Sequence, residues 1–135
     1  MRAIVTGGAG FIGSHVVDAL VARGDEVAVI DSLVHGKNEN VPSGAELHVR
    51  DIREPLDDIF DAVRPEAVFH LAAQADVRVS VEHPVEDAEV NVLGTVRILE
   101  AAQIQRETHA TVRHHDANGF PVLLKAEADG SIGLG

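Results

Sequence analysis

A chain of 135 residues is long enough to form one domain with its own hydrophobic core. Its 22 acidic and 11 basic residues give a formal net charge of −11, which disfavours nucleic acid and anionic membrane surfaces as partners. The sequence has no cysteine and no apolar run of signal-peptide or membrane-spanning type, so disulfides and zinc-thiolate sites are excluded and we expect a cytoplasmic protein.

The stretch from 2 to 13 joins an apolar run to a series of glycines and then to a helical pattern. The glycines fit two overlapping spacings, Gly8-x-Gly10-x-x-Gly13 and Gly7-x-x-Gly10-x-x-Gly13. One glycine allows a sharp turn, one lets the backbone approach a pyrophosphate, and one lets the helix lie close to the strand. The first amides of that helix point at the turn, so the pattern predicts an anion site and a dinucleotide-binding βαβ unit.

Asp31 stands 18 positions after Gly13, at the end of the second expected strand. A helix over 14 to 23, ended by Gly24, precedes the apolar run 27 to 30 that forms this strand. A carboxylate at this place accepts hydrogen bonds from the adenosine ribose and repels a 2′-phosphate, which favours NAD over NADP. The alternative is that Asp31 only caps a turn.

The rest of the pattern alternates strands and helices. The sequence predicts a polar loop at 32 to 40, a short strand at 47 to 49, a helix from 54 to 63, a central strand at 67 to 73, a polar loop at 74 to 86 and an amphipathic helix at 85 to 105. This order prescribes parallel strands joined by right-handed crossovers, with a ligand at their carboxyl ends where the strand order reverses. The glycine series, Asp31, Asp51 and residues 71 to 73 all fall at such ends.

Each of three polar residues in these elements has two possible roles. Asn91 interrupts the apolar face of the last helix, and its amide is satisfied either by the neighbouring loop or by a ligand. Lys37 in the first polar loop either meets a phosphate or is solvated. His70 in the central strand is expected to be a hydrogen-bonded core histidine rather than a catalyst.

Five segments together resemble the extended short-chain dehydrogenase/reductase family, specifically its sugar-nucleotide epimerases and dehydratases, with the UDP-glucose 4-epimerases nearest in pattern. The resemblance covers residues 1 to about 102. It implies an α/β fold with a Rossmann-type, doubly wound parallel sheet that binds NAD. The segments that carry it are Thr6 to His15, Asp31-Ser32-Leu33, Asp51-Ile52-Arg53, His70 to Gln74 and Asn91 to Thr95.

The same resemblance implies which residues bind the cofactor. These are Gly7, Gly10, Phe11, Ile12, Gly13, Asp31, Ser32, His35, Gly36, Lys37, Asp51, Ile52, Leu71, Ala72, Ala73, Gln74 and Asn91. Residues 11 and 12 would touch the pyrophosphate through their backbone, Asp31 would hold the adenosine ribose, and 32 to 37 would line the adenosine phosphate side. Asp51 and Ile52 would bind the adenine edge, 71 to 74 would pass beneath the nicotinamide half, and Asn91 would contact the cofactor from its helix.

The chain departs from the family's catalytic pattern, because it contains no tyrosine. Family members move a hydride between NAD and a sugar carbon through a keto-sugar intermediate, with a Ser or Thr and a Tyr-x-x-x-Lys pair whose tyrosine acts as the base. We therefore expect the NAD-binding part of such an enzyme, catalytically incomplete alone and able to act on a nucleotide sugar only if complemented. The alternatives are a non-catalytic dinucleotide-binding or complementing fragment, and a structural remnant.

Residues 107 to 135 form a divergent tail after the Rossmann portion 1 to 106, so we expect a truncated sheet with an atypical C-terminal β segment. An exposed edge where the sheet stops can pair with a second copy of the chain. No metal site is expected at His114 and His115, because adjacent residues of a strand face opposite sides.

The tail has two possible arrangements. A turn signal at 116 to 119 separates two β-rich runs. Either 110 to 115 forms a hairpin with 120 to 126, or 121 to 126 enters the parallel sheet as its fifth strand.

Overall fold

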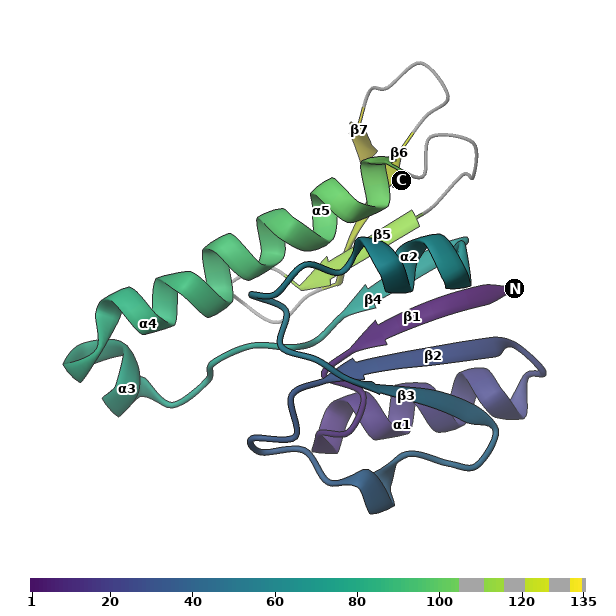
Figure 1. Cartoon of the computed structure of the whole chain (residues 1–135), viewed down its shortest axis with the longest axis horizontal. Helices are drawn as coiled ribbons and strands as arrows, with labels where there is room; N and C mark the ends of the chain where they lie inside the picture. The colour runs from purple at the N-terminus through teal and green to yellow at the C-terminus, as the bar shows by residue number, and fades with distance from the viewer. Residues whose placement is uncertain (105–110, 116–120, 127–131, 135) are drawn as a thin grey trace.

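The computed structural model describes residues 1–104, 111–115, 121–126 and 132–134 (Figure 1). Its strands are β1 (Arg2–Thr6), β2 (Glu26–Asp31), β3 (Ala45–Val49), β4 (Ala67–His70), β5 (Thr111–His115), β6 (Pro121–Ala126) and β7 (Ile132–Leu134). Its helices are α1 (Phe11–Ala22), α2 (Asp57–Val63), α3 (Val77–Glu82), α4 (Pro84–Ala88) and α5 (Thr95–Ile104), with a short 3-10 turn η1 (Asn38–Asn40) and a π-helical segment η2 (Glu89–Gly94).

The strands join one sheet in the order β3-β2-β1-β4-β5-β6-β7. Strands β1 to β5 run parallel to one another, whereas β6 runs antiparallel to β5 and β7 runs antiparallel to β6. The chain moves outward from β1 to β3 and then returns to β4 on the other side of β1, so the strand order reverses between β1 and β4 (Figure 1). Such a reversal leaves a crevice at the carboxyl ends of the strands, where ligands of open α/β sheets bind.

Helices cover both faces of the parallel part of the sheet (Figure 1). On one face α1 packs over a core that includes Ala3, Val5, Val17, Leu20, Val27 and Val29. On the other face α2 and α5 pack over a core that includes Ile4, Ala28, Ile30, Phe60, Val68 and Ile98. Successive residues of β1 alternate between the two cores, as expected for a central strand covered on both sides. The predicted doubly wound Rossmann-type sheet is confirmed.

The first βαβ unit forms where the sequence predicts it. Helix α1 begins at Phe11, because the extended backbone of Gly10 makes that residue its N-cap. It ends before Gly24, whose φ of +89° is the left-handed conformation that favours glycine after a helix.

The predicted polar loop at 74 to 86 is partly wrong, because it contains α3. The side chain of Asp76 caps this helix and accepts a hydrogen bond of 2.9 Å from the backbone N–H of Arg78. Val77 and Val81 on it are each 74% exposed, so α3 has no buried apolar face that a periodicity could reveal. The fourth strand is also shorter than predicted, because residues 71 to 76 leave the sheet as an irregular loop.

In the tail, β5 and β6 pair antiparallel from Thr111↔Lys125 to His115↔Pro121, which is the strand pairing that the hairpin interpretation expects. A parallel strand at 121 to 126 is therefore wrong, and β5 itself is the fifth parallel strand beside β4. Strand β7 was not predicted. The predicted turn at 116 to 119 and the proposed boundary between 106 and 107 lie outside the described residues.

Within the described part of the chain, no helix is long and apolar enough to cross a membrane.

Candidate functional site

The turn between β1 and α1 requires glycines at defined places. Gly7 has a φ of +70°, and a Cβ there would lie 2.7 Å from the backbone nitrogen of Ala72. A Cβ on Gly13 would overlap the carbonyl oxygen of Gly7, so α1 can lie this close to β1 only without a side chain there. Gly10, the N-cap, is less crowded, since its Cβ would lie 3.2 Å from the Gly7 oxygen. The predicted turn and close-packing roles thus fall on Gly7 and Gly13.

The N-terminus of α1 is open at this turn. Among the described residues no side chain caps it, and its first turn contains no acidic residue. Phe11 and Ile12 are 80% and 66% exposed, although both are large apolar residues. The unpaired amides of the first helical turn and the helix dipole favour an anion at this place.

Asp31 is buried at the end of β2, with 7% of its surface exposed. One carboxylate oxygen accepts a 3.0 Å hydrogen bond from the N–H of Ala9, and the other accepts a 2.8 Å bond from the N–H of Leu33. Leu33 has a φ of +58°, a conformation that costs a leucine roughly 1–2 kcal/mol. Asp31 therefore caps a turn, and because each carboxylate oxygen can accept more than one hydrogen bond, it keeps acceptor capacity for a ligand.

The loop after β2 is fastened to the glycine turn. The N–H of Lys37 and the side-chain Nδ2 of Asn40 both donate to the carbonyl oxygen of Ala9, at 3.0 and 2.8 Å. A Cβ on Gly36 would lie 2.7 Å from a carboxylate oxygen of Asp31, so the loop can approach Asp31 here only at a glycine. The side chain of Lys37 is exposed, and its contact with a phosphate stays a prediction.

Asp51 forms an ion pair with Arg53, whose Nη2 lies 2.7 Å from Asp51 Oδ2 and whose Nε lies 3.1 Å from each oxygen. Hydrogen bonds from the Arg53 side chain hold the pKa of Asp51 below its ordinary value. Arg53 also lies 3.8 Å from Glu89 at the start of η2. Between these residues and the sheet, Ile52 is buried and packs against Gly94. Asp51 is therefore an oriented carboxylate at neutral pH.

Thr6, at the end of β1, connects to the residues that follow β4. Its hydroxyl oxygen accepts hydrogen bonds from the N–H groups of Leu71 and Ala72, both at 3.2 Å. The hydroxyl hydrogen then points at Nδ1 of His70, 2.6 Å away, which places the ring proton on Nε2, 3.0 Å from the Thr95 hydroxyl. The predicted hydrogen-bonded core histidine is confirmed, and it links β1, β4 and α5.

Asn91, in η2, pairs with the backbone of Gln74. Its Oδ1 accepts a 2.8 Å hydrogen bond from the Gln74 N–H, and its Nδ2 donates a 2.9 Å bond to the Gln74 carbonyl oxygen. Of the two partners that the sequence allows for Asn91, the neighbouring loop is the one present in the structure. A contact between Asn91 and a coenzyme stays a prediction.

A cavity of about 250 Å³ at the carboxyl ends of β1, β2 and β4 brings most of the predicted residues together. The predicted residues that line it are Gly7, Gly10, Asp31, Ser32, His35, Gly36, Asp51, Ile52, Leu71, Ala72, Ala73 and Gln74. Phe11, Ile12, Gly13, Lys37 and Asn91 do not line it. Of these, Gly13 and Asn91 act through neighbours, because Gly13 packs against Gly7 and Asn91 holds Gln74.

Other lining residues were missed from the sequence. They are Ile30, Arg50, Arg53, Glu86 and Val90, whereas Val34, which also lines the cavity, falls in the predicted range 32 to 37. Arg53 left a signal, because an arginine two positions after an aspartate can close back on its carboxylate. Glu86 and Val90 left none, since only the return of α4 and η2 towards the sheet brings them to the cavity.

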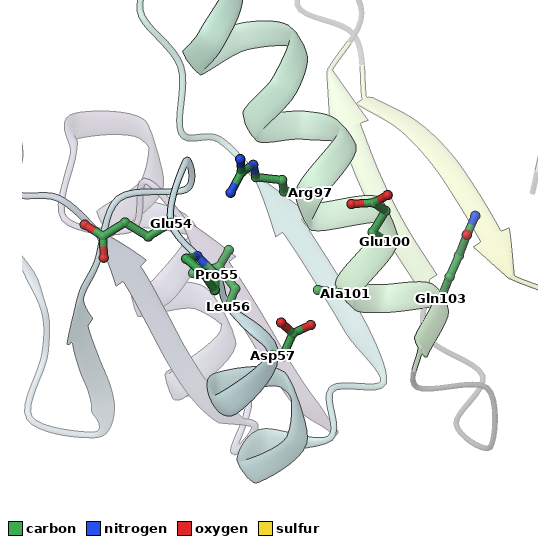
Figure 2. Close-up of a pocket in the computed structure, with 8 residues that line it drawn as sticks. All are labelled: Glu54, Pro55, Leu56, Asp57, Arg97, Glu100, Ala101 and Gln103. Atoms are coloured by element: carbon green, nitrogen blue, oxygen red, sulfur yellow. The ribbon is translucent and has the colours of Figure 1, made fainter.

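A larger cavity, of about 820 Å³, lies between the segment before α2 and one side of α5 (Figure 2). It is lined by Glu54, Pro55, Leu56, Asp57, Arg97, Glu100, Ala101 and Gln103. Figure 2 shows the side chain of Arg97 pointing from α5 towards the segment that contains Pro55. This cavity contains no strand end and no predicted site residue, so the smaller cavity is the candidate site.

The strand order of the parallel sheet reverses beside a glycine turn, an open helix N-terminus and the acidic residue that ends β2. This combination defines a dinucleotide-binding domain of the Rossmann type. The chain belongs to the NAD dependent epimerase/dehydratase family, whose model matches residues 3–114. The family resemblance inferred from the sequence is confirmed.

Individual relatives are similar to this chain in sequence over part of their length. The chain is 46% identical over 110 residues to a UDP-glucose 4-epimerase of Mycolicibacterium smegmatis, covering 77% of this chain and 35% of that protein. It therefore spans about a third of the length of the curated relatives it matches.

Solved structures extend the comparison. The Thermus thermophilus UDP-glucose 4-epimerase in complex with NAD has a TM-score of 0.75 and 54% identity, over 78% of this chain and 34% of that one. The Thermotoga maritima UDP-glucose 4-epimerase with UDP-glucose has a TM-score of 0.78 and 35% identity, over 96% of this chain and 47% of that one.

Proposed function

We propose that this chain binds NAD in the cavity at the carboxyl ends of β1, β2 and β4. The observation that carries the proposal is that the glycine turn, the loop after β4 and the buried Asp31 carboxylate line one cavity beside the open N-terminus of α1. Together they offer a diphosphate close backbone approach and a ribose a hydrogen-bond acceptor. The Thermus epimerase, 54% identical over the matched part, is a complex with NAD.

Each part of the coenzyme has its own residues in this proposal. The amides of Phe11 and Ile12 hold the pyrophosphate, because they belong to the uncapped first turn of α1. Asp31 accepts from the adenosine ribose, and residues 32 to 37 line the adenosine phosphate side. Asp51 and Ile52 lie at the adenine edge, and residues 71 to 74 lie under the nicotinamide half.

The preference for NAD over NADP follows from the charge of Asp31. Its carboxylate is almost completely removed from solvent, and each oxygen already accepts a backbone N–H, so its place is fixed. A 2′-phosphate brought to that place would meet a negative charge at low dielectric.

We infer that the chain represents the NAD-binding part of a sugar-nucleotide epimerase or dehydratase and does not complete the reaction alone. NAD in such an enzyme accepts and returns the hydride of a sugar carbon. Removing the hydroxyl proton of that carbon requires a base, for which the family pattern implies a tyrosine, and the sequence contains none. Activity on a nucleotide sugar would therefore require complementation by residues from elsewhere.

Coenzyme-dependent thermal stability tests the proposal. At a hundredfold excess over its Kd, NAD should stabilise the chain by about 2.7 kcal/mol. Asp31→Ala and Gly10→Val should abolish most of this gain, because the first removes the ribose acceptor and the second fills the approach to the pyrophosphate. Asp18→Ala, an exposed acid on α1, is the matched control and should respond to NAD like the wild type.

The outcomes separate the alternatives. NAD-dependent stabilisation with no turnover of a UDP-hexose supports the binding part proposed here. An absence of stabilisation in a folded chain supports the structural remnant. Turnover by the purified chain would contradict the inference that it is incomplete. The cytoplasmic location and pairing through a sheet edge stay predictions, the second open to a mass measurement in solution.

A further inference from the structure

We propose that Asp87 is a positioning residue that fixes the loop of residues 71–76, the β4–α3 loop, and through it the nicotinamide half of the coenzyme. Asp87 belongs to α4 and, unlike its neighbour Glu86, does not line the cavity. The inference rests on the proposed NAD site and assigns to it a residue that neither the sequence pattern nor the cavity identifies.

The β4–α3 loop needs anchors from outside. Its six residues have no regular secondary structure, yet Leu71, Ala72, Ala73 and Gln74 line the cavity. Thr6 holds the first end of the loop through the N–H groups of Leu71 and Ala72. Among the described residues, the other end of the loop, around Gln74, is hydrogen-bonded by side chains and not by a neighbouring strand.

Asn91 supplies the first contact to Gln74. Its amide takes both the N–H and the carbonyl oxygen of Gln74, as a neighbouring strand would. The pairing is specific only while the Asn91 amide has its oxygen towards the N–H and its nitrogen towards the carbonyl. If the Asn91 amide were rotated by half a turn, its NH2 group would face the N–H of Gln74 and its oxygen would face the Gln74 carbonyl oxygen, so neither hydrogen bond could form.

Asp87 fixes that orientation and the orientation of the Gln74 side chain. Its Oδ1 accepts a 2.8 Å hydrogen bond from Gln74 Nε2 and a 3.1 Å bond from Asn91 Nδ2. Gln74 Oε1 in turn accepts from the N–H of Asp76, and Nε2 donates to the Asp76 carbonyl oxygen. A single carboxylate oxygen thus selects one arrangement of two amides, and these hold the loop at Gln74 and Asp76.

The chemistry of this contact predicts which substitutions are tolerated. Both partners of Asp87 are donors to the same oxygen, so the contact needs an acceptor and not a charge. Asp87→Asn keeps a carbonyl oxygen of the same reach, whereas Asp87→Ala leaves two half-buried N–H groups without this acceptor.

The test compares two ligands that share the adenosine diphosphate part. NAD and ADP are titrated into the full chain and into Asp87→Ala, Asp87→Asn and Glu82→Ala. Glu82 is an exposed acid five positions away and serves as the matched control. Asp87→Ala should weaken NAD about tenfold and change ADP by less than about twofold, because only NAD extends over the β4–α3 loop. Asp87→Asn and Glu82→Ala should bind both ligands like the wild type.

Amide hydrogen exchange adds a measurement that does not depend on the ligand. The N–H groups of Gln74 and Asp76 should exchange about tenfold faster in Asp87→Ala than in Asp87→Asn, without a change in the strands. Equal losses of NAD and ADP, or an unchanged NAD affinity, would overturn the role of Asp87. Failure of the wild type to bind either ligand would instead contradict the proposed NAD site, and the inference with it.

Discussion

The glycine turn of residues 7–13 and the β4–α3 loop line the same cavity but are stabilised differently. The glycine turn has its shape because side chains are absent, at Gly7 and Gly13 above all. The β4–α3 loop has its shape because side chains are present on Thr6, Asn91 and Asp87, which lie on three other elements. Changes to the turn should therefore damage folding and binding together, whereas changes to the loop anchors should separate the two.

The largest effect is expected for Gly13→Ala. A methyl group there would overlap the Gly7 carbonyl oxygen, which would force α1 away from β1 and cost about 3 kcal/mol in the free energy of unfolding. Urea unfolding and NAD titration measure the two effects. Gly24→Ala is the control, because it has nothing within 4 Å of its Cβ and only the strain of its positive φ, about 1 kcal/mol. Equal costs for the two variants would contradict the steric role of Gly13.

The next largest effect is expected for Thr6→Val. The change keeps the shape of the side chain but leaves the N–H group of Ala72 and the Nδ1 atom of His70 without the Thr6 hydroxyl, while the N–H group of Leu71 keeps its 3.1 Å hydrogen bond to the backbone oxygen of Thr6. We expect a loss of about 2 kcal/mol in the free energy of unfolding. Thr95→Val removes the contact at the far side of the His70 ring and the 2.8 Å hydrogen bond from the Thr95 hydroxyl to the Asn91 carbonyl oxygen. It should cost about half as much, because it leaves no backbone N–H group without its acceptor. A larger cost for Thr95→Val would show that the anchor lies in α5 and not in β1.

A smaller effect is expected for Asp31→Asn, and it concerns selectivity. The variant removes the negative charge and keeps an acceptor oxygen for only one of the two N–H groups, because Ala9 and Leu33 donate to different oxygens of Asp31. The preference for NAD over NADP should fall about tenfold, equivalent to about 1.4 kcal/mol. Binding of both coenzymes at several salt concentrations measures it. An unchanged preference would mean that steric exclusion, and not charge, rejects the 2′-phosphate.

The smallest effect is expected for the Asp51 and Arg53 ion pair and depends on pH. Because hydrogen bonds from Arg53 lower the pKa of Asp51 in the folded state, the pair stabilises the fold above the unfolded-state pKa and loses this contribution as pH falls below about 4. Both side chains are partly exposed, so we expect less than about 1 kcal/mol. The stability difference between wild type and Asp51→Asn should shrink on acidification. A difference that grows at low pH would contradict this assignment.

The same contrast explains what could be predicted from the sequence. The glycine turn is encoded within a few consecutive residues, so strand, turn, helix and Asp31 are all evident from local spacing. The anchors of the β4–α3 loop join residues 13 to 66 positions apart, so no local pattern reveals them. The sequence shows that Asn91 needs a partner but not which one, and nothing in it distinguishes Asp87 from the other acidic residues.

The prediction of secondary structure failed where the burial of apolar residues follows no regular spacing along the sequence. The apolar residues of α3 are exposed, and the helix is set by the side-chain cap from Asp76 instead. The sequence is compatible with two arrangements of the tail, because its β-rich runs fit either strand direction. Only the pairing of β6 with β5 decides between them.

The π-helical segment η2 has a consequence for insertions and deletions. Asp87 and Asn91 contact Gln74, and Thr95 contacts His70, so these three residues, which are four positions apart, lie along one face of the helical rod. After Thr95 the helix resumes the spacing that turns Ile98, Ala101 and Ala102 to the core. A π-helical turn holds about one residue more than an α-helical turn. Deleting one residue between 89 and 94 should therefore convert η2 into regular α-helix and keep the polar contacts and the apolar packing in phase, whereas deleting a second residue would put the two halves of the helical rod out of phase.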